Sequence, residues 1–331
     1  MTTAPRSAAS DPAGRTSPAG PPARVRTRRR RRVRTEAVSG YLFVAPAVIL
    51  FAVMGAYTVG YGFVLSFVQW NGFTPDWDWV GFDNYADLLW RSPVYAPEVH
   101  EAAINTLWVM IFVPLLTIAV SFPLAVLLNQ AKRMQGILNS VYFMPYVTTG
   151  IAVYFAWRYI LQPDGAINLL LGGLGLGSLE QPQGWLGNPD TALGTLIVVI
   201  SWGGVPVAML LYLTGLQSID KSVLEAAQLD GAGWWRTQFS VVWPMLMPLT
   251  AVNVLLNLRE SLQGFQTFLV MAGQNGAPGG HTNVLGLMAY RLAFLEDLAP
   301  TLGLASALGW ILFAVAILLA VINLRAMRSR T

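Results

Sequence analysis

Long apolar blocks separated by short polar stretches make up most of the sequence from residue 41 onward. The block over 41–67 contains no charged residue and exceeds the roughly 20 apolar residues that a helix needs to cross a bilayer. Four further blocks are equally clean, and one, over 241–271, carries polar and charged residues. The pattern predicts six membrane spans, at 41–67, 106–128, 137–157, 192–216, 241–271 and 302–323.

These spans are expected to be helices. Backbone groups in lipid must be hydrogen-bonded within one segment or around a closed barrel. Barrel strands give alternating segments of about ten residues, which the uninterrupted apolar runs do not resemble. The sequence therefore predicts an all-α membrane protein with six transmembrane helices.

The distribution of Lys and Arg predicts the orientation of these helices, because basic loops stay on the cytoplasmic side. The loops 69–105, 161–191 and 272–301 contain only Arg91 and Arg291. The other segments are richer in basic residues, and both termini are therefore predicted to be cytoplasmic. Those residues are Arg24, Arg26, Arg28 to Arg32, Arg34, Lys132, Arg133, Lys221, Arg236, Arg325, Arg328 and Arg330.

Residues 1–35 differ in composition from the rest of the chain. They are rich in Pro, Ala, Ser, Gly and Arg and hold too little apolar surface to fold alone. We expect a disordered basic cytoplasmic tail, followed by a transmembrane domain over 36–331. An arginine run can also bind nucleic acid or anionic lipid, but beside a first span it is interpreted as a topology signal, and no nucleic-acid partner is expected.

Composition and motifs exclude most catalytic functions. Of the 331 residues, 54% are hydrophobic and 11% charged, against about 25% charged in an ordinary soluble domain. There is no cysteine, only His100 and His281 are histidines, and no phosphate-binding loop occurs. We therefore expect no catalytic residue, no metal site and no ATP site in this chain, so any energy must come from a partner.

The segment at about 219–240, between the fourth and fifth spans, is the most informative. Val223, Leu224 and Ala227 predict a short amphipathic helix, and Gly231 can take the left-handed conformation that ends it. A second short helix is expected after this break. From the residues alone, a short helix that docks another protein and a helix that lies on the membrane surface are equally compatible with the pattern.

Within this segment Glu225-Ala226-Ala227, Gly231 and Val241-Val242-Trp243-Pro244 resemble the Glu-Ala-Ala loop of permease subunits of binding-protein-dependent ABC importers. Val241 and Trp243 stand where Ile and Leu are usual in that pattern. Other pieces resemble the carbohydrate branch of the family, similar to the maltose transporter. They are Tyr41-Leu42-Phe43-Val44-Ala45-Pro46, Val80-Gly81-Phe82-Asp83-Asn84-Tyr85, Phe143-Met144-Pro145 and Gly276-Ala277-Pro278-Gly279-Gly280.

The resemblance implies a multi-pass subunit of a bacterial cell membrane importer that moves a small carbohydrate by alternating access. Its implied partners are a second homologous permease, two nucleotide-binding ATPase subunits that bind ATP and Mg, and an extracytoplasmic solute-binding protein. It also implies that the cytoplasmic helix couples the chain to an ATPase subunit through Glu225, Ala226, Ala227, Asp230, Gly231 and Ala232.

Polar residues inside predicted spans point to a substrate pathway, because they are costly in lipid and usually face a cavity or a partner. At 100° per residue, Asn253, Asn257, Glu260 and Ser261 share one arc of the fifth span, and Arg259 falls in a second cluster opposite. In the fourth span, Trp202 and Gly204 precede Pro206, where an unwound or kinked point is expected. Trp202 or Tyr212 could stack on a sugar ring.

The sequence is compatible with other roles for these residues, other substrates and other classes of protein. Asn253, Asn257 and Ser261 could instead bridge helices. The substrate could be glycerol phosphate or another polyol derivative. An ion-coupled secondary transporter is a rival from another class, opposed by the scarcity of buried carboxylates other than Glu260. A membrane scaffold or enzyme has no residue constellation to support it.

Overall fold

The computed structural model describes residues 40–73, 75–131, 136, 150–295 and 301–328. The chain divides into two units, residues 1–60 and 61–331. In the first unit, residues 40–60 are helical and contain a π-helical turn at Ala52–Ala56. The predicted tail over 1–35 lies outside the described residues.

Four helices of the described part are long and apolar enough to cross a membrane: Gly40–Leu65, Tyr95–Gln130, Pro189–Ser218 and Leu302–Asn323. They correspond to predicted spans one, two, four and six. Most of predicted span three lies outside the described residues, and its last part is the start of α6 (Gly150–Ile160). The chain is thus a largely helical membrane protein, and the count of six spans stays a prediction.

Predicted span five is a set of helical pieces rather than one helix. They are the end of a π-helical segment (Thr237–Val242), α11 (Trp243–Met245), α12 (Met247–Gln263) and α13 (Phe265–Ala272), and α10 (Trp234–Arg236) precedes them. The axis bends by 70° between Met245 and Met247, and α12 ends before Gly264. Pro248 lies in the first turn of α12, where a missing backbone N–H costs least. The segment over 241–271 is therefore a broken span or a re-entrant loop, and its crossing of the membrane stays a prediction.

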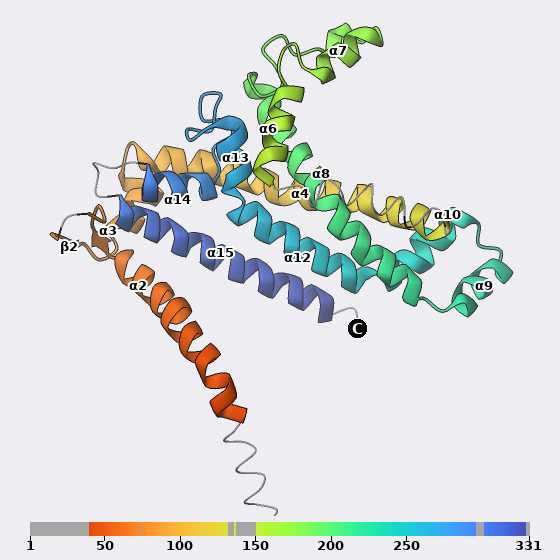
Figure 1. Cartoon of the computed structure of the whole chain (residues 1–331), viewed down its shortest axis with the longest axis horizontal. Helices are drawn as coiled ribbons and strands as arrows, with labels where there is room; N and C mark the ends of the chain where they lie inside the picture. Colours follow the sequence, from red (N-terminus) through yellow and green to blue (C-terminus); the bar gives the residue numbers. More distant parts are fainter. Residues whose placement is uncertain (1–39, 74, 132–135, 137–149, 296–300, 329–331) are drawn as a thin grey trace, which may run out of the picture. The chain divides into compact units, whose positions relative to one another are not determined.

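Helix α4 (Tyr95–Gln130) packs along α8 (Pro189–Ser218), and α12 packs against α4, α8 and α15 (Leu302–Arg328). In Figure 1, α12 lies between α8 and α15. One apolar cluster joins α4 to α8 and α13, a second joins the first turns of α4 to α14 (Leu285–Phe294) and α15, and a third joins the last turns of α4 and α8 to Leu246.

The predicted loop 69–105 is a folded element. It contains a hairpin of β1 (Val68–Gln69) and β2 (Asp78–Trp79), the short helix α3 (Asp83–Ala86) and a π-helical turn (Asp87–Arg91). The hairpin is antiparallel, with Val68 opposite Trp79. The all-α expectation is therefore corrected by this small sheet, and residues 95–105 belong to α4.

Two other short helical segments precede α8. α7 (Ala166–Gly173) and a 3₁₀ turn (Gly177–Leu179) lie between α6 and α8. α8 begins where the side chain of Asn188 accepts a hydrogen bond from the backbone N–H of Asp190, 3.0 Å away. This N-cap satisfies a free donor of the first turn, so the sequence Asn-Pro-Asp fixes the start of the helix.

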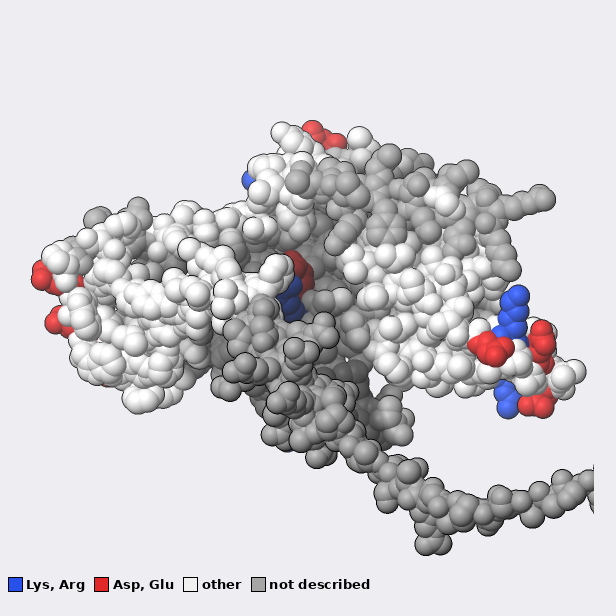
Figure 2. Space-filling view, turned by 60° about the horizontal axis from the view of Figure 1, so that its bottom comes forward, with Lys and Arg blue, Asp and Glu red and all other residues white. Residues whose placement is uncertain are grey.

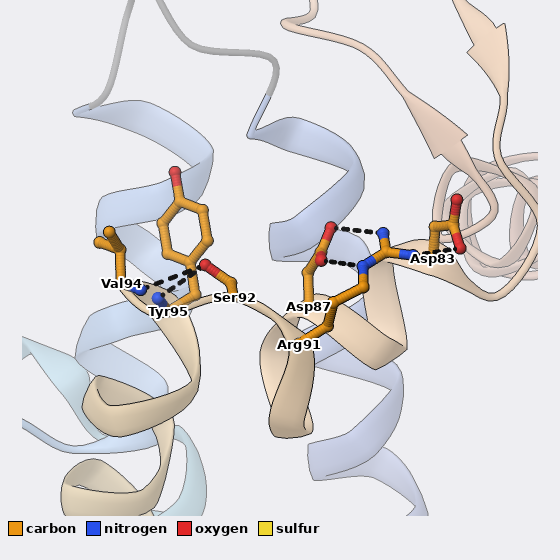
Figure 3. Close-up of polar contacts among 6 residues, drawn as sticks. All are labelled: Asp83, Asp87, Arg91, Ser92, Val94 and Tyr95. Atoms are coloured by element: carbon orange, nitrogen blue, oxygen red, sulfur yellow. Dashed lines mark hydrogen bonds and ion pairs between the residues drawn. The ribbon is translucent and has the colours of Figure 1, made fainter.

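Arg91 and Arg291 are each held by acidic residues. Arg91 donates to Asp87 at 2.6 Å and to Asp83 at 2.7 Å, as Figure 3 shows. The neighbouring Ser92 hydroxyl accepts hydrogen bonds from the backbone N–H groups of Val94 and Tyr95. The bonds to Asp87 and then Asp83 raise the pKa of Arg91 above its ordinary value. Arg291 pairs with Glu98. Both guanidinium charges in the predicted outer loops are therefore locally neutralised.

Candidate functional site

A cavity of about 530 Å³ opens between α4, α6, α8 and α12. Its size lies within the range of about 300–1,000 Å³ that is usual for small-molecule sites. Apolar residues make up most of its wall, including Val120, Val153 and Leu256. The polar and aromatic groups of the wall are Tyr154, Trp202, Asn253, Asn257, Arg259 and Glu260.

Helix α12 contributes most of the polar wall. Asn253 and Asn257 are buried, and Asn257 Nδ2 donates to the backbone oxygen of Asn253 at 2.8 Å. Ser261 is also buried but does not line the cavity; its hydroxyl donates to the backbone oxygen of Asn257 at 2.8 Å. Part of this amide and hydroxyl capacity is therefore used within α12 itself.

Arg259 lies on the same cavity as Asn257, although helical spacing put the two on opposite sides of the helix. Leu256, which is 60° from Arg259 at 100° per residue, also lines the wall. The cavity therefore wraps around more of α12 than one narrow stripe, and it contains a positive and a negative side chain.

The facing part of α8 is an uninterrupted helix. Residues 202–206 stay within α8, with Pro206 inside it, so this segment is not unwound, and the kinked alternative stays a prediction. Pro is tolerated in membrane helices because neighbouring groups satisfy the freed backbone. A side chain at Gly204 would begin 3.2 Å from Asn257 Oδ1 and 3.3 Å from Thr117 Oγ1. Gly204 therefore allows α8 to approach α4 and α12 closely.

The two aromatic candidates differ in position. Trp202 is partly exposed, lines the cavity and makes an edge contact with Trp157 of α6 at 5.3 Å between ring centroids. Tyr212 is fully buried and its hydroxyl donates to Thr250 Oγ1 at 3.0 Å. The ring of Tyr212 is therefore inaccessible to a sugar in this structure, whereas Trp202 offers an accessible ring.

The segment after α8 has the predicted order of helix, glycine break and helix. α9 spans Lys221–Leu229, Gly231 has φ +77°, and α10 follows. Gly231 N donates to Gln228 O and Ala232 N donates to Ala227 O, both at 3.0 Å. This is the Schellman pattern, in which the left-handed residue after the helix is nearly always Gly.

The six residues predicted to couple the chain to a partner fall on different faces. Glu225, Ala226, Asp230 and Gly231 are exposed and Ala232 is half-buried. Ala227 is buried, so it lies on the inner face rather than offering a low outer surface. In Figure 2, charged side chains of both signs gather over α9, at the right of the view.

Asp220 caps α9. Its carboxylate accepts a hydrogen bond from the backbone N–H of Ser222 at 3.0 Å, and this bond lowers the pKa of Asp220 below its ordinary value. Since the charged cap satisfies a free donor at the helix start, α9 is fixed at both ends by its own sequence.

Several cavity and surface residues were not found from the sequence. Tyr154 lines the cavity, and Trp235 and Phe239 stack at 6.0 Å between ring centroids on the surface after α9, whereas the sequence placed Arg259 only in the opposite polar cluster of the fifth span. The paired tryptophans at 234 and 235, in a segment predicted to lie outside the bilayer, were the available signal for the surface aromatics. Tyr154 had none, because the sequence does not show which spans are neighbours.

Long apolar helices around a cavity with buried polar groups are typical of multi-pass membrane proteins that transport a substrate. A comparison with protein families agrees. The chain belongs to the family described as binding-protein-dependent transport system inner membrane component, which matches residues 102–330.

Named relatives cover most of the chain. The lactose transport system permease protein LacF of Rhizobium radiobacter is 30% identical over 88% of this chain and 95% of its own length. The diacetylchitobiose uptake system permease protein NgcF of Streptomyces coelicolor is 27% identical over 91% and 85%. These relatives are transport permease components rather than enzymes.

Among solved structures, a bacterial ABC transporter involved in the import of the acidic polysaccharide alginate contains a chain with the same fold. Its TM-score is 0.72, with 21% identity over 90% of this chain and 99% of that one. A second structure of an alginate ABC transporter, in complex with an alginate pentasaccharide-bound periplasmic protein, gives a TM-score of 0.70 at 20% identity, over 87% of this chain and 93% of that one.

Proposed function

We propose that this chain is a transmembrane subunit of an ATP-driven importer that moves a sugar or oligosaccharide across a bacterial plasma membrane. Six spans would place both termini in the cytoplasm. The names of its relatives support a carbohydrate substrate, since lactose and diacetylchitobiose permeases match along nearly their whole length. A second permease would complete the pathway, and an extracytoplasmic solute-binding protein would deliver the substrate.

The observation that carries the proposal is the cavity. Asn257, Glu260 and Arg259 offer hydrogen-bond donors and acceptors on a wall that also holds the accessible ring of Trp202. Sugar hydroxyls need both donors and acceptors, and sugar rings pack on aromatic faces. A mostly apolar cavity with a few placed polar groups is typical of such sites.

ATP and Mg would be bound by two partner ATPase subunits. α9 would fit into a groove on one of them, as helices do in groove recognition. Closure of the ATPase pair on ATP would move α9 and open the cavity outward, and hydrolysis would return it inward. Glu225, Ala226, Asp230 and Gly231 support this role through their exposure, and Ala227 and Ala232 would set the geometry of the helix end.

Asn257→Leu tests the cavity. It removes the amide from the wall while keeping the side chain size, and loss of one hydrogen bond of about 0.5–1.5 kcal/mol corresponds to roughly twofold to tenfold weaker apparent substrate affinity. The measurement is sugar uptake by proteoliposomes that contain the complete complex. Asn323→Leu is the matched control, because Asn323 is on α15 and does not line the cavity. Uptake by Asn257→Leu at the parent affinity would contradict the assignment.

The same proteoliposomes test the energy source. Uptake should require ATP inside the vesicle compartment that holds the ATPase subunits, and it should persist when an ionophore removes the proton gradient. Uptake that follows the gradient while ATP stays high would show an ion-coupled transporter instead.

A further inference from the structure

Four aromatic side chains form a cluster on the hairpin element that precedes α4. Phe67 stacks on Trp79 at 5.7 Å between ring centroids and makes contacts with Phe82 at 5.2 Å and Tyr85 at 5.7 Å. In spite of these contacts, Trp79 is 63% exposed and Phe82 is 74% exposed. Exposed apolar patches of this kind usually mark an interaction surface. Phe67, Trp79, Phe82 and Tyr85 are called the aromatic cluster below.

The hairpin element is fixed to the first turn of α15. The backbone N–H of Leu302 donates to Trp70 O at 3.0 Å, and Trp70 forms a parallel bridge with Thr301. Asn84 Nδ2 donates to Ser66 O at 3.0 Å and to Val68 O at 2.9 Å. Because the apolar membrane span of α15 begins at Leu302, these bonds hold the cluster at the level of the first residues of that span.

Aromatic contacts continue from the cluster onto the surface of that span. Phe67 contacts Phe63 at 5.1 Å, Phe63 contacts Trp310 at 4.8 Å, and Trp310 contacts Phe313 at 5.1 Å. Phe313 lies well inside α15 and is 49% exposed. The exposed aromatic surface of the hairpin is therefore continuous with an apolar surface of the membrane span.

The charge of the element argues against an electrostatic attachment. Residues 66–92 contain four Asp and one Arg, and that arginine is already bonded to Asp83 and Asp87. A negatively charged element is not attracted by anionic lipid headgroups, which draw basic segments. Trp and Tyr, in contrast, prefer the boundary between headgroups and acyl chains whatever the headgroup charge.

We propose that the aromatic cluster lies in the headgroup and glycerol layer of the bilayer and sets the depth and tilt of this end of the transmembrane domain. Trp79 and Phe82 supply the buried apolar area, and the hairpin transmits their position to α15 through the bonds at Trp70. This inference depends on the membrane location of the chain and not on the transported substrate.

Single-cysteine labelling tests the proposal, and the chain suits it because it has no cysteine of its own. A nitroxide is attached to Phe82→Cys in the full-length protein, reconstituted in phosphatidylcholine vesicles. Its collision rates with lipid-soluble oxygen and with a water-soluble nickel chelate are compared. Phe313→Cys serves as the lipid reference, and Ser178→Cys, in the exposed turn before α8, is the aqueous reference.

The expected result is a ratio of oxygen to nickel collisions between the two references and closer to that of Phe313→Cys. Adding anionic phosphatidylglycerol should leave the ratio unchanged. In the Phe82→Cys background, Trp79→Ser should shift the ratio towards the aqueous reference, whereas Trp79→Tyr, which keeps an amphipathic ring, should retain it.

Three outcomes would overturn the proposal. The label at residue 82 could match Ser178→Cys in pure lipid vesicles, which places the cluster in water. It could become protected only when a solute-binding protein is added, which makes the surface a protein interface. A ratio that rises with phosphatidylglycerol content would show an electrostatic attachment that the four Asp residues oppose.

Discussion

The contact between the hairpin and α15 gives a sharp test of the packing, because Gly303 leaves no room for a side chain. A Cβ at this position would lie 1.8 Å from the backbone oxygen of Val68 and 2.9 Å from Asn84 Nδ2. Carbon and oxygen atoms in ordinary contact are about 3.5 Å apart. In Gly303→Ala the hairpin must therefore move away by roughly 1.5 Å, and the neighbouring atom is backbone, which cannot rotate aside.

The expected cost follows from what this movement breaks. Val68 O accepts a hydrogen bond from Asn84, and a buried donor left unpaired costs about 1–3 kcal/mol. Overpacking adds about 1–3 kcal/mol. The higher helix propensity of Ala returns up to about 1 kcal/mol. The net destabilisation of Gly303→Ala is on the order of 3 kcal/mol.

Gly309→Ala is the matched control, because a Cβ there has no heavy atom within 4 Å and the position is on the same helix. It should be neutral or stabilising by up to about 1 kcal/mol. Thermal unfolding of the two purified variants in the same detergent measures the difference, expected as a melting temperature roughly 5–15 °C lower for Gly303→Ala. Hydrogen exchange at the amides of Val80 and Leu302, which bond to Phe67 and Trp70, should increase only in that variant. A Gly303→Ala protein that melts with or above Gly309→Ala would refute the argument.

Two further predictions concern the segment around α9. Gly231→Val should leave membrane insertion intact but uncouple ATP hydrolysis from uptake, because a backbone φ of +77° is strained for a branched residue. The control Gly233→Val, at φ −64° and with equally open surroundings, should be tolerated. Normal substrate-stimulated ATPase activity in Gly231→Val would count against this prediction. Asp220→Ala should increase hydrogen exchange in the first turn of α9 at neutral pH. Since the pKa of Asp220 in the folded protein lies below its ordinary value, the charged cap stabilises α9 fully at neutral pH and is lost only as the pH falls below about 4. Equal hydrogen exchange in the variant and the parent at pH 7 would contradict the capping prediction.

The single-helix spans could be predicted from the sequence because lipid demands an uncharged run of fixed length, and hydropathy reports that demand directly. The start of α4 was missed for the same reason. Residues 95–105 carry charge, yet Val99 and Ala102 are buried against α14 and α15 while His100 and Glu101 face outward. This part of α4 is stabilised by an amphipathic face rather than by lipid, so a search for uncharged runs places the start of the helix too late along the chain, at Thr106.

The helix break around Gly231 was predictable because its determinants are local: an amphipathic run, a capping residue and a glycine. The cavity was only partly predictable. Helical spacing grouped Asn257 and Glu260, but it could not show that α6 supplies Tyr154 or that the wall extends to Arg259. Those facts depend on which helices are neighbours, and one sequence gives periodicity within a segment but not the pairing between segments.

The broken form of the fifth span has a mechanical consequence for the proposed function. α9 packs against the π-helical segment Thr237–Val242, which leads through the 70° bend into α12, and α12 lines the cavity with Asn257. The bend is held by Leu246, which is buried among the last turns of α4 and α8. If α9 moves as proposed, the movement would reach α12 through this packed bend. Because a close-packed joint has discrete arrangements instead of a continuous range, movement at α9 is expected to switch the cavity wall between two positions.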